Sequence, residues 1–449
     1  MKYINILIGI LMLIACSPES VTIRDFSVAK EDIKKLVLRA DHKTLVPNGI
    51  GKMEFHVLAY GEKEFTEYKD VMTADTMYYD ENRKTVLYQI PNDLLPKDCI
   101  KVYDENGIEI KDNIFSTTET GVRKIHFYAQ GGNIRSNEYE ISIRELPDES
   151  YEEIVYPVIF HVLIPPTSSG PTYSISSEFL QERLDRINDI FNRKVTSDPN
   201  GGNAKITFKL AEYDEDGLPL LEKGKHEVQL TSAMSDRYDY IDYIERRLIW
   251  NPMKYLNVWI AKFSNSISDS GSETYIAEDP SVILRGSESI PDIDAEEVDT
   301  FTADDVESFA DAGFIVNFHE FLNPNVFNSN SFEVGTAFAA YLGLRRTDYY
   351  DSYGIAVVFD ETGDTDFCPD TYFYDKYNEL IYKNNDLSEC YNYPFDIDPI
   401  EYFTSFNVMD RYSRKNSLSI DQVKRIRAVV ERCPSRWAYK SEWAFTGKE

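Results

Sequence analysis

Histidine is scarce in this chain, and its spacing excludes one common metal motif. The 449 residues contain six histidines, and no two of them stand four positions apart. Two histidines one helical turn apart are a widespread zinc-binding arrangement, so no histidine pair of this kind is available. His226 and His319 are each followed by glutamate, but neither has a second histidine one turn further on. We therefore expect both to be structural residues of strands or loops.

Basic residues are too few to balance the acidic ones. The chain has 47 Lys and Arg against 77 Asp and Glu, which gives a formal net charge of −30. A field of this sign repels polyanions, so nucleic acid is not an expected partner. Hydrophobic residues make up 42% of the chain and aromatic residues 13%, which excludes a largely disordered protein. The length favours several folded domains.

No apolar run is long enough to cross a bilayer. Residues 1–15 contain Lys2 and about a dozen consecutive apolar residues, which predicts a signal peptide rather than a membrane helix. The run ends in Leu13-Ile14-Ala15-Cys16, which resembles the lipobox of bacterial lipoproteins, where the cysteine becomes the lipidated first residue. The residue after the cysteine is Ser17 and not an acidic residue, which resembles the pattern of lipoproteins sent to the outer membrane. We expect an outer-membrane lipoprotein anchored at Cys16, with 16–24 as a tether and either the periplasmic or the cell-surface side exposed; an ordinary signal peptide is the alternative.

Cysteine is also rare. Four cysteines remain after Cys16: Cys99, Cys368, Cys390 and Cys433. In an exported protein this number allows two disulfides. We predict a Cys368–Cys390 disulfide, because it would close a loop of about twenty residues and stabilise the fold by roughly 3 kcal/mol. Cys99 and Cys433 lie in different predicted domains, and their pairing is left open.

Residues 25–146 show the alternation of β-strands. The segments 52–58, 122–128 and 138–143 alternate apolar and polar residues, and turn sequences such as Asn106-Gly107 lie between the strands. This pattern predicts an N-terminal β-sandwich. Its last part resembles bacterial Ig-like modules, which are usually spacers or adhesive units. The polar, proline-bearing stretch 147–151 is the predicted linker.

From residue 152 the pattern changes to mixed strands and helices. Apolar strands are predicted at 156–164, 206–210 and 256–261. Helices are predicted at 177–193, capped by Ser176 or Ser177, and at 238–250. The sequence thus predicts a multidomain protein in which an α/β (α+β) domain over 152–435 follows the sandwich, with 436–449 as a C-terminal tail.

Residues 336–346 read Thr-Ala-Phe-Ala-Ala-Tyr-Leu-Gly-Leu-Arg-Arg, and this segment is compared below with a known sequence motif. The context of Gly343 resembles the metzincin zinc peptidases, closest to the pappalysin-like lipoprotein peptidases of the Bacteroidota. In that family the helix reads His-Glu-x-x-His-x-x-Gly-x-x-His, where the histidines bind zinc and the glutamate is the general base. Further along, Asn407-Val408-Met409-Asp410 looks like the family's Met-turn, and a helix with a capping box is predicted over 419–432.

The chemistry of the family motif is missing. Aligned on Gly343, the positions of the first ligand, the base, the second ligand and the third ligand are Thr336, Ala337, Ala340 and Arg346. The resemblance therefore implies a metzincin-like fold that has lost zinc and its hydrolysis, and no cofactor is expected. Arg346 would place a permanent cation near the former metal position, where it could bind a carboxylate. The favoured function is a cell-envelope pseudopeptidase that binds a peptide or protein ligand without cutting it.

Other interpretations remain open. The protein could be an active zinc-dependent metalloendopeptidase or another hydrolase with a non-standard centre, or an adhesive or structural surface lipoprotein acting through the Ig-like domain. The segment 336–346 could also be a buried helix with a glycine C-cap in an unrelated α/β domain. Four aspartates near Gly363 could hold calcium, but their spacing does not match an EF-hand and solvated charge is the favoured interpretation; they are Asp360, Asp364, Asp366 and Asp370.

Overall fold

The structure is a computed structural model. It describes residues 28–72, 77–146, 150–166, 174–196, 198–234, 237–262, 275–322, 334–347, 366–371, 379–382, 389–394, 401–404, 406–410 and 416–449. The chain divides into two compact units: one comprises Met1–Val37, Val57–Lys101 and Ala129–Ser136, and the other comprises Leu38–His56, Val102–Tyr128 and Asn137–Glu449. The predicted signal peptide and Cys16 lie outside the described residues. Within the described part of the chain, no helix is long and apolar enough to span a bilayer.

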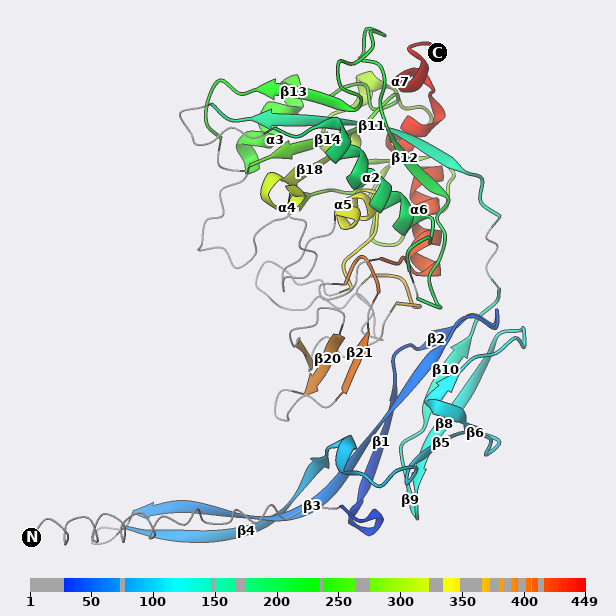
Figure 1. Ribbon diagram of the computed structural model, residues 1–449, viewed down its shortest axis with the longest axis vertical. Helices are drawn as coiled ribbons and strands as arrows, with labels where there is room; N and C mark the ends of the chain where they lie inside the picture. Colours follow the sequence, from blue (N-terminus) through cyan, green and yellow to red (C-terminus); the bar gives the residue numbers. More distant parts are fainter. Residues whose placement is uncertain are drawn as a thin grey trace, which may run out of the picture. The chain divides into compact units, whose positions relative to one another are not determined.

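The part of the chain before residue 146 is built from strands in two sheets (Figure 1). One sheet has the order β1-β3-β4, with β7 paired to β3, and the other has the order β2-β10-β8-β5-β6, with β9 paired to β8. The strands predicted at 52–58, 122–128 and 138–143 correspond to β3, β8 and β10. The bounds are β1 Lys35–Ala40, β2 Thr44–Leu45, β3 Met53–Met72, β4 Met77–Ile90, β5 Lys101–Asp104, β6 Glu109–Ile110, β7 Ile114–Phe115, β8 Arg123–Gly131, β9 Ile134–Arg135 and β10 Tyr139–Ile143.

A mostly parallel sheet forms the centre of the following region. Its order is β12-β11-β14-β18-β15, and β13 pairs with the second half of β11. Only β15 runs antiparallel to its neighbour. The strands are β11 Ile154–Ile164, β12 Ile206–Leu210, β13 Lys225–Gln229, β14 Leu256–Ala261, β15 Tyr275–Ile276 and β18 Gly313–Asn317. The mixed α/β expectation is thereby confirmed for this region.

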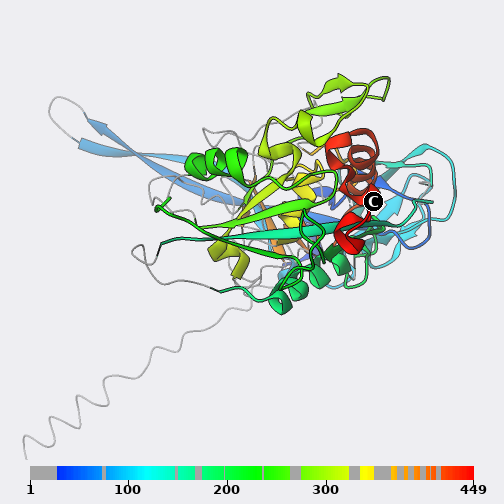
Figure 2. The same cartoon turned by 90° about the horizontal axis from the view of Figure 1, so that it is seen from above.

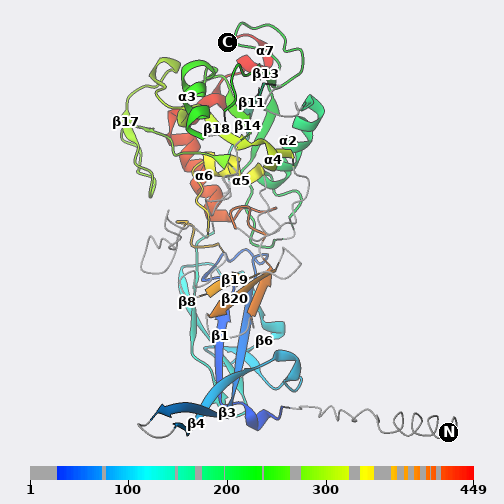
Figure 3. The same ribbon diagram turned by 90° about the vertical axis from the view of Figure 1, so that its left-hand side faces the viewer.

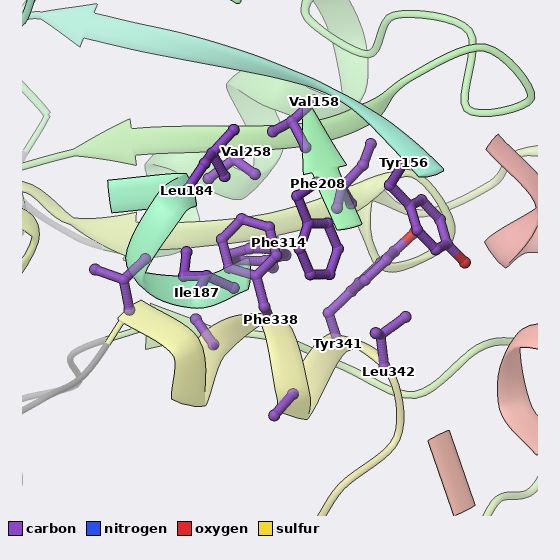
Figure 4. Close-up of a cluster of buried hydrophobic side chains, with 14 of the residues drawn as sticks. Tyr156, Val158, Leu184, Ile187, Phe208, Val258, Phe314, Phe338, Tyr341 and Leu342 are labelled. Carbon is purple, nitrogen blue, oxygen red and sulfur yellow. The ribbon is translucent and has the colours of Figure 1, made fainter. Parts of the chain in front are cut away.

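Helices cover both faces of this sheet, which explains why its central strands β11, β14 and β18 are buried at almost every position. The α-helices are α2 Ser177–Phe191, α3 Arg237–Arg247, α4 Phe318–Leu322, α5 Val334–Tyr341, α6 Ile420–Arg432 and α7 Trp443–Thr446. In Figure 3, α3 and α2 lie on opposite sides of β11, β14 and β18. One face packs against α2, α5 and α6, and the other packs against α3. Figure 4 shows the first of these cores, in which Phe338 of α5 lies 4.7 Å from Phe208 and 4.9 Å from Phe314, measured between ring centroids.

Smaller elements complete the described chain. They are β16 Val282–Leu284 paired with β17 Glu296–Val298, the three-stranded sheet of β19 Glu379–Tyr382, β20 Glu389–Pro394 and β21 Glu401–Thr404, and the 3₁₀ turns η1 Lys30–Asp32, η2 Asn92–Leu94, η3 Lys111–Asn113, η5 Ala303–Asp305, η6 Phe309–Asp311 and η7 Pro434–Lys440. Residues 436–449 are packed rather than extended, because Arg436 is fully buried and the Tyr156 hydroxyl donates to its carbonyl oxygen over 2.5 Å.

The helix predicted over 238–250 ends early, at Arg247. The backbone beyond it is held by side chains of β14 instead. Asn257 accepts from the Trp250 N–H and donates to the Trp250 carbonyl, and the Trp259 indole donates to the Leu248 carbonyl over 2.9 Å. These tertiary hydrogen bonds take the place of the last helical turn that the sequence predicted.

Candidate functional site

Helix α5 ends in a glycine turn pressed against α6. Gly343 has a φ of +88°, and the chain leaves the helix through hydrogen bonds from the Gly343 N–H to the Ala340 carbonyl and from the Leu344 N–H to the Ala339 carbonyl. This pattern is a Schellman cap, which needs a left-handed residue at that position. A Cβ at Gly343 would lie 2.6 Å from Cγ2 of Val429. Glycine is therefore required at 343 both by the backbone conformation and by packing.

A tight turn over Asn407–Asp410 carries a buried methionine. The Asp410 N–H donates to the Asn407 carbonyl over 3.3 Å, so the segment is a 1,4-turn, and Met409 is 1% exposed. The side chains of Asn407 and Gln422 exchange hydrogen bonds of 2.9 and 3.1 Å. Gln422 also completes the predicted capping box with Ser419, so the turn is attached to the first turn of α6.

Thr336 connects α5 to this turn. Its hydroxyl donates to the carbonyl oxygen of Val408 over 2.9 Å, and the side chain is only 4% exposed. Helix α5 therefore lies directly against the turn that carries Met409.

The side chains at this place do not fit a zinc ion. The Thr336 oxygen already donates to Val408, Ala337 is fully buried, and neither Ala337 nor Ala340 has a donor atom. Zinc in proteins is held by thiolate, imidazole or carboxylate ligands. No group of three or more such side chains is close enough to hold a metal in the described part of the chain. No step of zinc chemistry can be derived for these residues.

Arginines hold the chain on both sides of Gly343. Arg345 makes a two-pronged ion pair with Asp279, at 2.8 and 2.5 Å, and its Nε donates to Asp292 over 2.8 Å. Arg425 of α6 donates from Nε to the Gly343 carbonyl over 2.6 Å. Arg346 is half-buried at the same turn. The sequence singled out Arg346 but not Arg345 or Arg425, whose partners are distant in the chain.

His161, which is fully buried, and His226, which is half-buried, form a pair. Nδ1 of His161 lies 2.9 Å from Nδ1 of His226, and Nε2 of His161 lies 2.9 Å from Oδ1 of Asn257. Because Oδ1 can only accept, His161 carries its proton on Nε2 and accepts from His226 at Nδ1. Burial and the neighbouring His226 lower the pKa of His161 from 6.5 to about 3. His226 lies on β13 as predicted, whereas His319 lies on helix α4 and the strand-or-loop prediction for it is wrong.

The predicted disulfide is not formed. Cys368 is a free cysteine with 1% exposure, and the side chain of Cys390 lies outside the described residues. Cys99, which is half-buried, and Cys433, which is buried, are free cysteines too. Burial and then the nearby carboxylates, chiefly Asp366, raise the pKa of the Cys368 thiol. Cys368 is thus packed inside the protein, which corrects the expectation of a Cys368–Cys390 bridge.

Two of the four aspartates near Gly363 are described, and both are buried. Asp366 is 1% exposed and accepts from the Cys368 N–H, and Asp370 is 7% exposed. Asp370 accepts from the Ser419 hydroxyl over 2.5 Å and from the Asp421 N–H over 2.9 Å. The interpretation of solvated charge is wrong for these two residues. Asp360 and Asp364 lie outside the described residues.

Comparison with known proteins gives structural neighbours only. No family model matches the sequence, and no curated protein matches it. Among solved structures, mature mirolysin of Tannerella forsythia in complex with a cleaved peptide is 18% identical, with a TM-score of 0.40, covering 66% of this chain and 98% of that chain. A promirolysin mutant of the same organism is 16% identical, with a TM-score of 0.39 and coverages of 67% and 86%. Mirolysin in complex with compound 9 is 18% identical, with a TM-score of 0.42 and coverages of 67% and 100%. Values this low transfer no residue role to this chain.

Proposed function

We propose that this chain is a cell-envelope lipoprotein with a metzincin-like metallopeptidase fold that binds a peptide or protein ligand without hydrolysing it. The observation that carries the proposal is the contact between Thr336 of α5 and the 1,4-turn that contains Met409. It supports the proposal, because the two segments are more than sixty residues apart in the sequence and are nevertheless in contact.

The loss of catalysis is proposed from the chemistry of the side chains. A zinc peptidase needs ligands that hold the ion and a base that takes a proton from the attacking water. Thr336, Ala337 and Ala340 cannot supply either function. At the fourth position Arg346 brings a positive charge, which repels a metal ion and favours a carboxylate. We propose that a carboxylate of the ligand binds at Arg346.

Zinc stoichiometry tests the fold and the loss of the metal together. The mature chain from residue 17 onward is compared by plasma mass spectrometry with a variant carrying Thr336→His, Ala337→Glu, Ala340→His and Arg346→His. We expect no zinc in the first protein and about one zinc per chain in the second, because the variant restores a three-histidine site. Stoichiometric zinc in the unaltered chain would disprove the proposal. Failure of the correctly folded variant to take up zinc would argue against the metzincin-like fold.

Peptide binding tests the role of Arg346. A defined peptide mixture is offered to the immobilised mature chain, once with free C-terminal carboxylates and once with amidated C-termini. We expect the free carboxylates to be retained more strongly and the preference to disappear in Arg346→Ala. Arg246→Ala is the matched control, because Arg246 is exposed on α3, where it forms an ion pair with Asp242 at 2.6 Å. Equal retention by Arg346→Ala and the unaltered chain would remove the proposed carboxylate site.

We also propose the outer-membrane anchor at Cys16. Metabolic labelling with a radioactive fatty acid is expected to label the full chain and not the Cys16→Ser variant. Cys99→Ser is the control, because Cys99 carries a free thiol outside the lipobox. A label that persists in Cys16→Ser would exclude lipidation at this cysteine.

A further inference from the structure

Strands β3 and β4 form a long two-stranded ribbon. They pair antiparallel without interruption from Ala59 opposite Ile90 to Met72 opposite Met77. Strand β1 pairs only with the first part of β3. The hydrogen bond from the Lys34 N–H to the Tyr60 carbonyl lies where this pairing stops, and β3 continues to Met72. Figures 1 and 2 show β3 and β4 as a long twisted ribbon.

The outer edge of β4 is an open template for another strand. β4 is the last strand in its sheet order, and no other described strand pairs with it. Residues 77–90 contain no proline and no glycine, and their continuous register with β3 leaves no bulge. Natural edge strands are usually short, or carry proline, a bulge or charged side chains, to prevent pairing with other chains; β4 is long and has no bulge, and its charges form one acidic and one basic block. A two-stranded ribbon is also only marginally stable alone, so an added strand would stabilise it.

The sequence of β4 is complementary to itself. Residues Asp80-Glu81-Asn82-Arg83-Lys84 place two acidic residues before a central asparagine and two basic residues after it. If two copies of β4 pair antiparallel about Asn82, each Asp80 stands opposite a Lys84 and each Glu81 opposite an Arg83. The same register places Tyr79 opposite Thr85 and Tyr78 opposite Val86, which are favourable pairs of aromatic and β-branched residues.

We propose that the β4 edge is a homodimer interface, in which two copies of the chain join their ribbons into one four-stranded antiparallel sheet with a twofold axis at Asn82. An interface of this kind is isologous, because each residue i contacts residue j of the other copy and the reverse. Backbone hydrogen bonds supply the attraction, and the two blocks of opposite charge fix the antiparallel register. A shift of the register by two residues would bring like charges together, so a single alignment is favoured.

Sedimentation analysis of the mature chain over a concentration series tests the interface. The acidic variant Arg83→Glu with Lys84→Asp puts acid opposite acid in all four charged pairs, and we expect its dimer dissociation constant to rise by at least about tenfold. The basic variant Asp80→Lys with Glu81→Arg is expected to dissociate in the same way. A monomeric unaltered chain over the whole series would overturn the proposal, as would a dimer that neither variant weakens.

Mixing the two variants keeps the test independent of folding. The acidic strand and the basic strand are complementary to each other in the proposed register, so the mixture is expected to form heterodimers although each variant alone is monomeric. The combined variant with all four changes reverses both blocks and should dimerise like the unaltered chain. If the mixture and the combined variant stay monomeric while both proteins show the circular dichroism of the unaltered chain, self-pairing of β4 is excluded.

Discussion

At Gly343 a single methyl group is enough to test how closely α5 and α6 pack. Replacing this residue by alanine forces a left-handed backbone on an L side chain and pushes Cβ to 2.6 Å from Val429. We expect Gly343→Ala to lower the free energy of unfolding by roughly 1–3 kcal/mol from the backbone strain alone, with a further loss from the contact. Urea unfolding at fixed pH measures the change.

Gly286 provides a matched control for this substitution. It has a φ of +77°, but no atom lies within 4 Å of the position of its Cβ. Gly286→Ala therefore reports the conformational cost without the contact, and Gly343→Ala should be the more destabilising of the two. The second change Val429→Ala should recover part of the difference. Equal losses for both glycines would show that α6 does not restrict position 343.

The pair of His161 and His226 makes stability depend on pH. In the folded chain the pKa of His161 is about 3, against 6.5 ordinarily, because the ring is buried and lies beside His226. As the pH falls from 6.5 towards 3, His161 binds a proton in the unfolded chain but stays neutral in the folded chain. We therefore expect this pair to lower the free energy of unfolding by up to about 1.4 kcal/mol per pH unit in that range. Denaturant unfolding at several pH values should show a flatter slope for His161→Phe.

The control for this measurement is His126, an exposed residue of β8 with 42% of its side chain accessible. His126→Phe should leave the slope unchanged. A slope that is the same in His161→Phe and in the unaltered chain would mean that another group is responsible for the loss of stability in acid.

At the scale of elements, the sequence predicted those helices and strands whose bounds depend on the spacing of apolar residues and on capping residues. The helix expected at 177–193 is α2, its N-cap is Ser176, and Leu180, Leu184 and Ile187 lie buried on one face of it. Strand β14 and helix α6 were predicted within one residue of their bounds. The early end of α3 was not predicted, because it depends on hydrogen bonds from Asn257. Contacts between distant segments leave no periodic pattern in the sequence.

The contact between α5 and the Asn407–Asp410 turn can be tested with a substitution of equal volume. Thr336→Val keeps the shape of the side chain but removes the hydrogen bond to the Val408 carbonyl. We expect a loss of about 1 kcal/mol in the free energy of unfolding. Thr336→Ser keeps the donor, so hydrogen exchange at the turn should remain slow in this variant and become faster in Thr336→Val. Unchanged exchange in both variants would contradict a linking role for Thr336.

At the scale of the whole molecule, residues from both predicted domains meet inside one compact unit. Arg144 follows β10 and makes a bidentate contact with Asp421 in the first turn of α6. Its Nη1 also lies 3.8 Å from Oδ2 of Asp370. Burial and then the charge of Asp421 raise the pKa of Asp370 to about 7. The sequence could not predict this cluster, since a buried aspartate next to another depends on an arginine more than two hundred residues away.

Removing Arg144 should therefore cost more at high pH than at low pH. Asp370 has a higher pKa in the folded chain than the ordinary 3.8, so its ionisation opposes folding as the pH rises from about 4 to 7. Without Arg144, the ionised form of Asp370 would lose the attraction of this guanidinium, so its ionisation would oppose folding more strongly. Since Arg144 is 24% exposed, we expect Arg144→Met to lose about 3 kcal/mol at pH 8, near the lower limit for breaking a buried ion pair, and clearly less at pH 5.

Arg123→Met removes an exposed pair with Glu119 and should change stability by less than about 1 kcal/mol at either pH. Urea unfolding at both pH values decides the matter, because an equal loss at pH 5 and pH 8 would mean that Arg144 acts through packing and not through its charge.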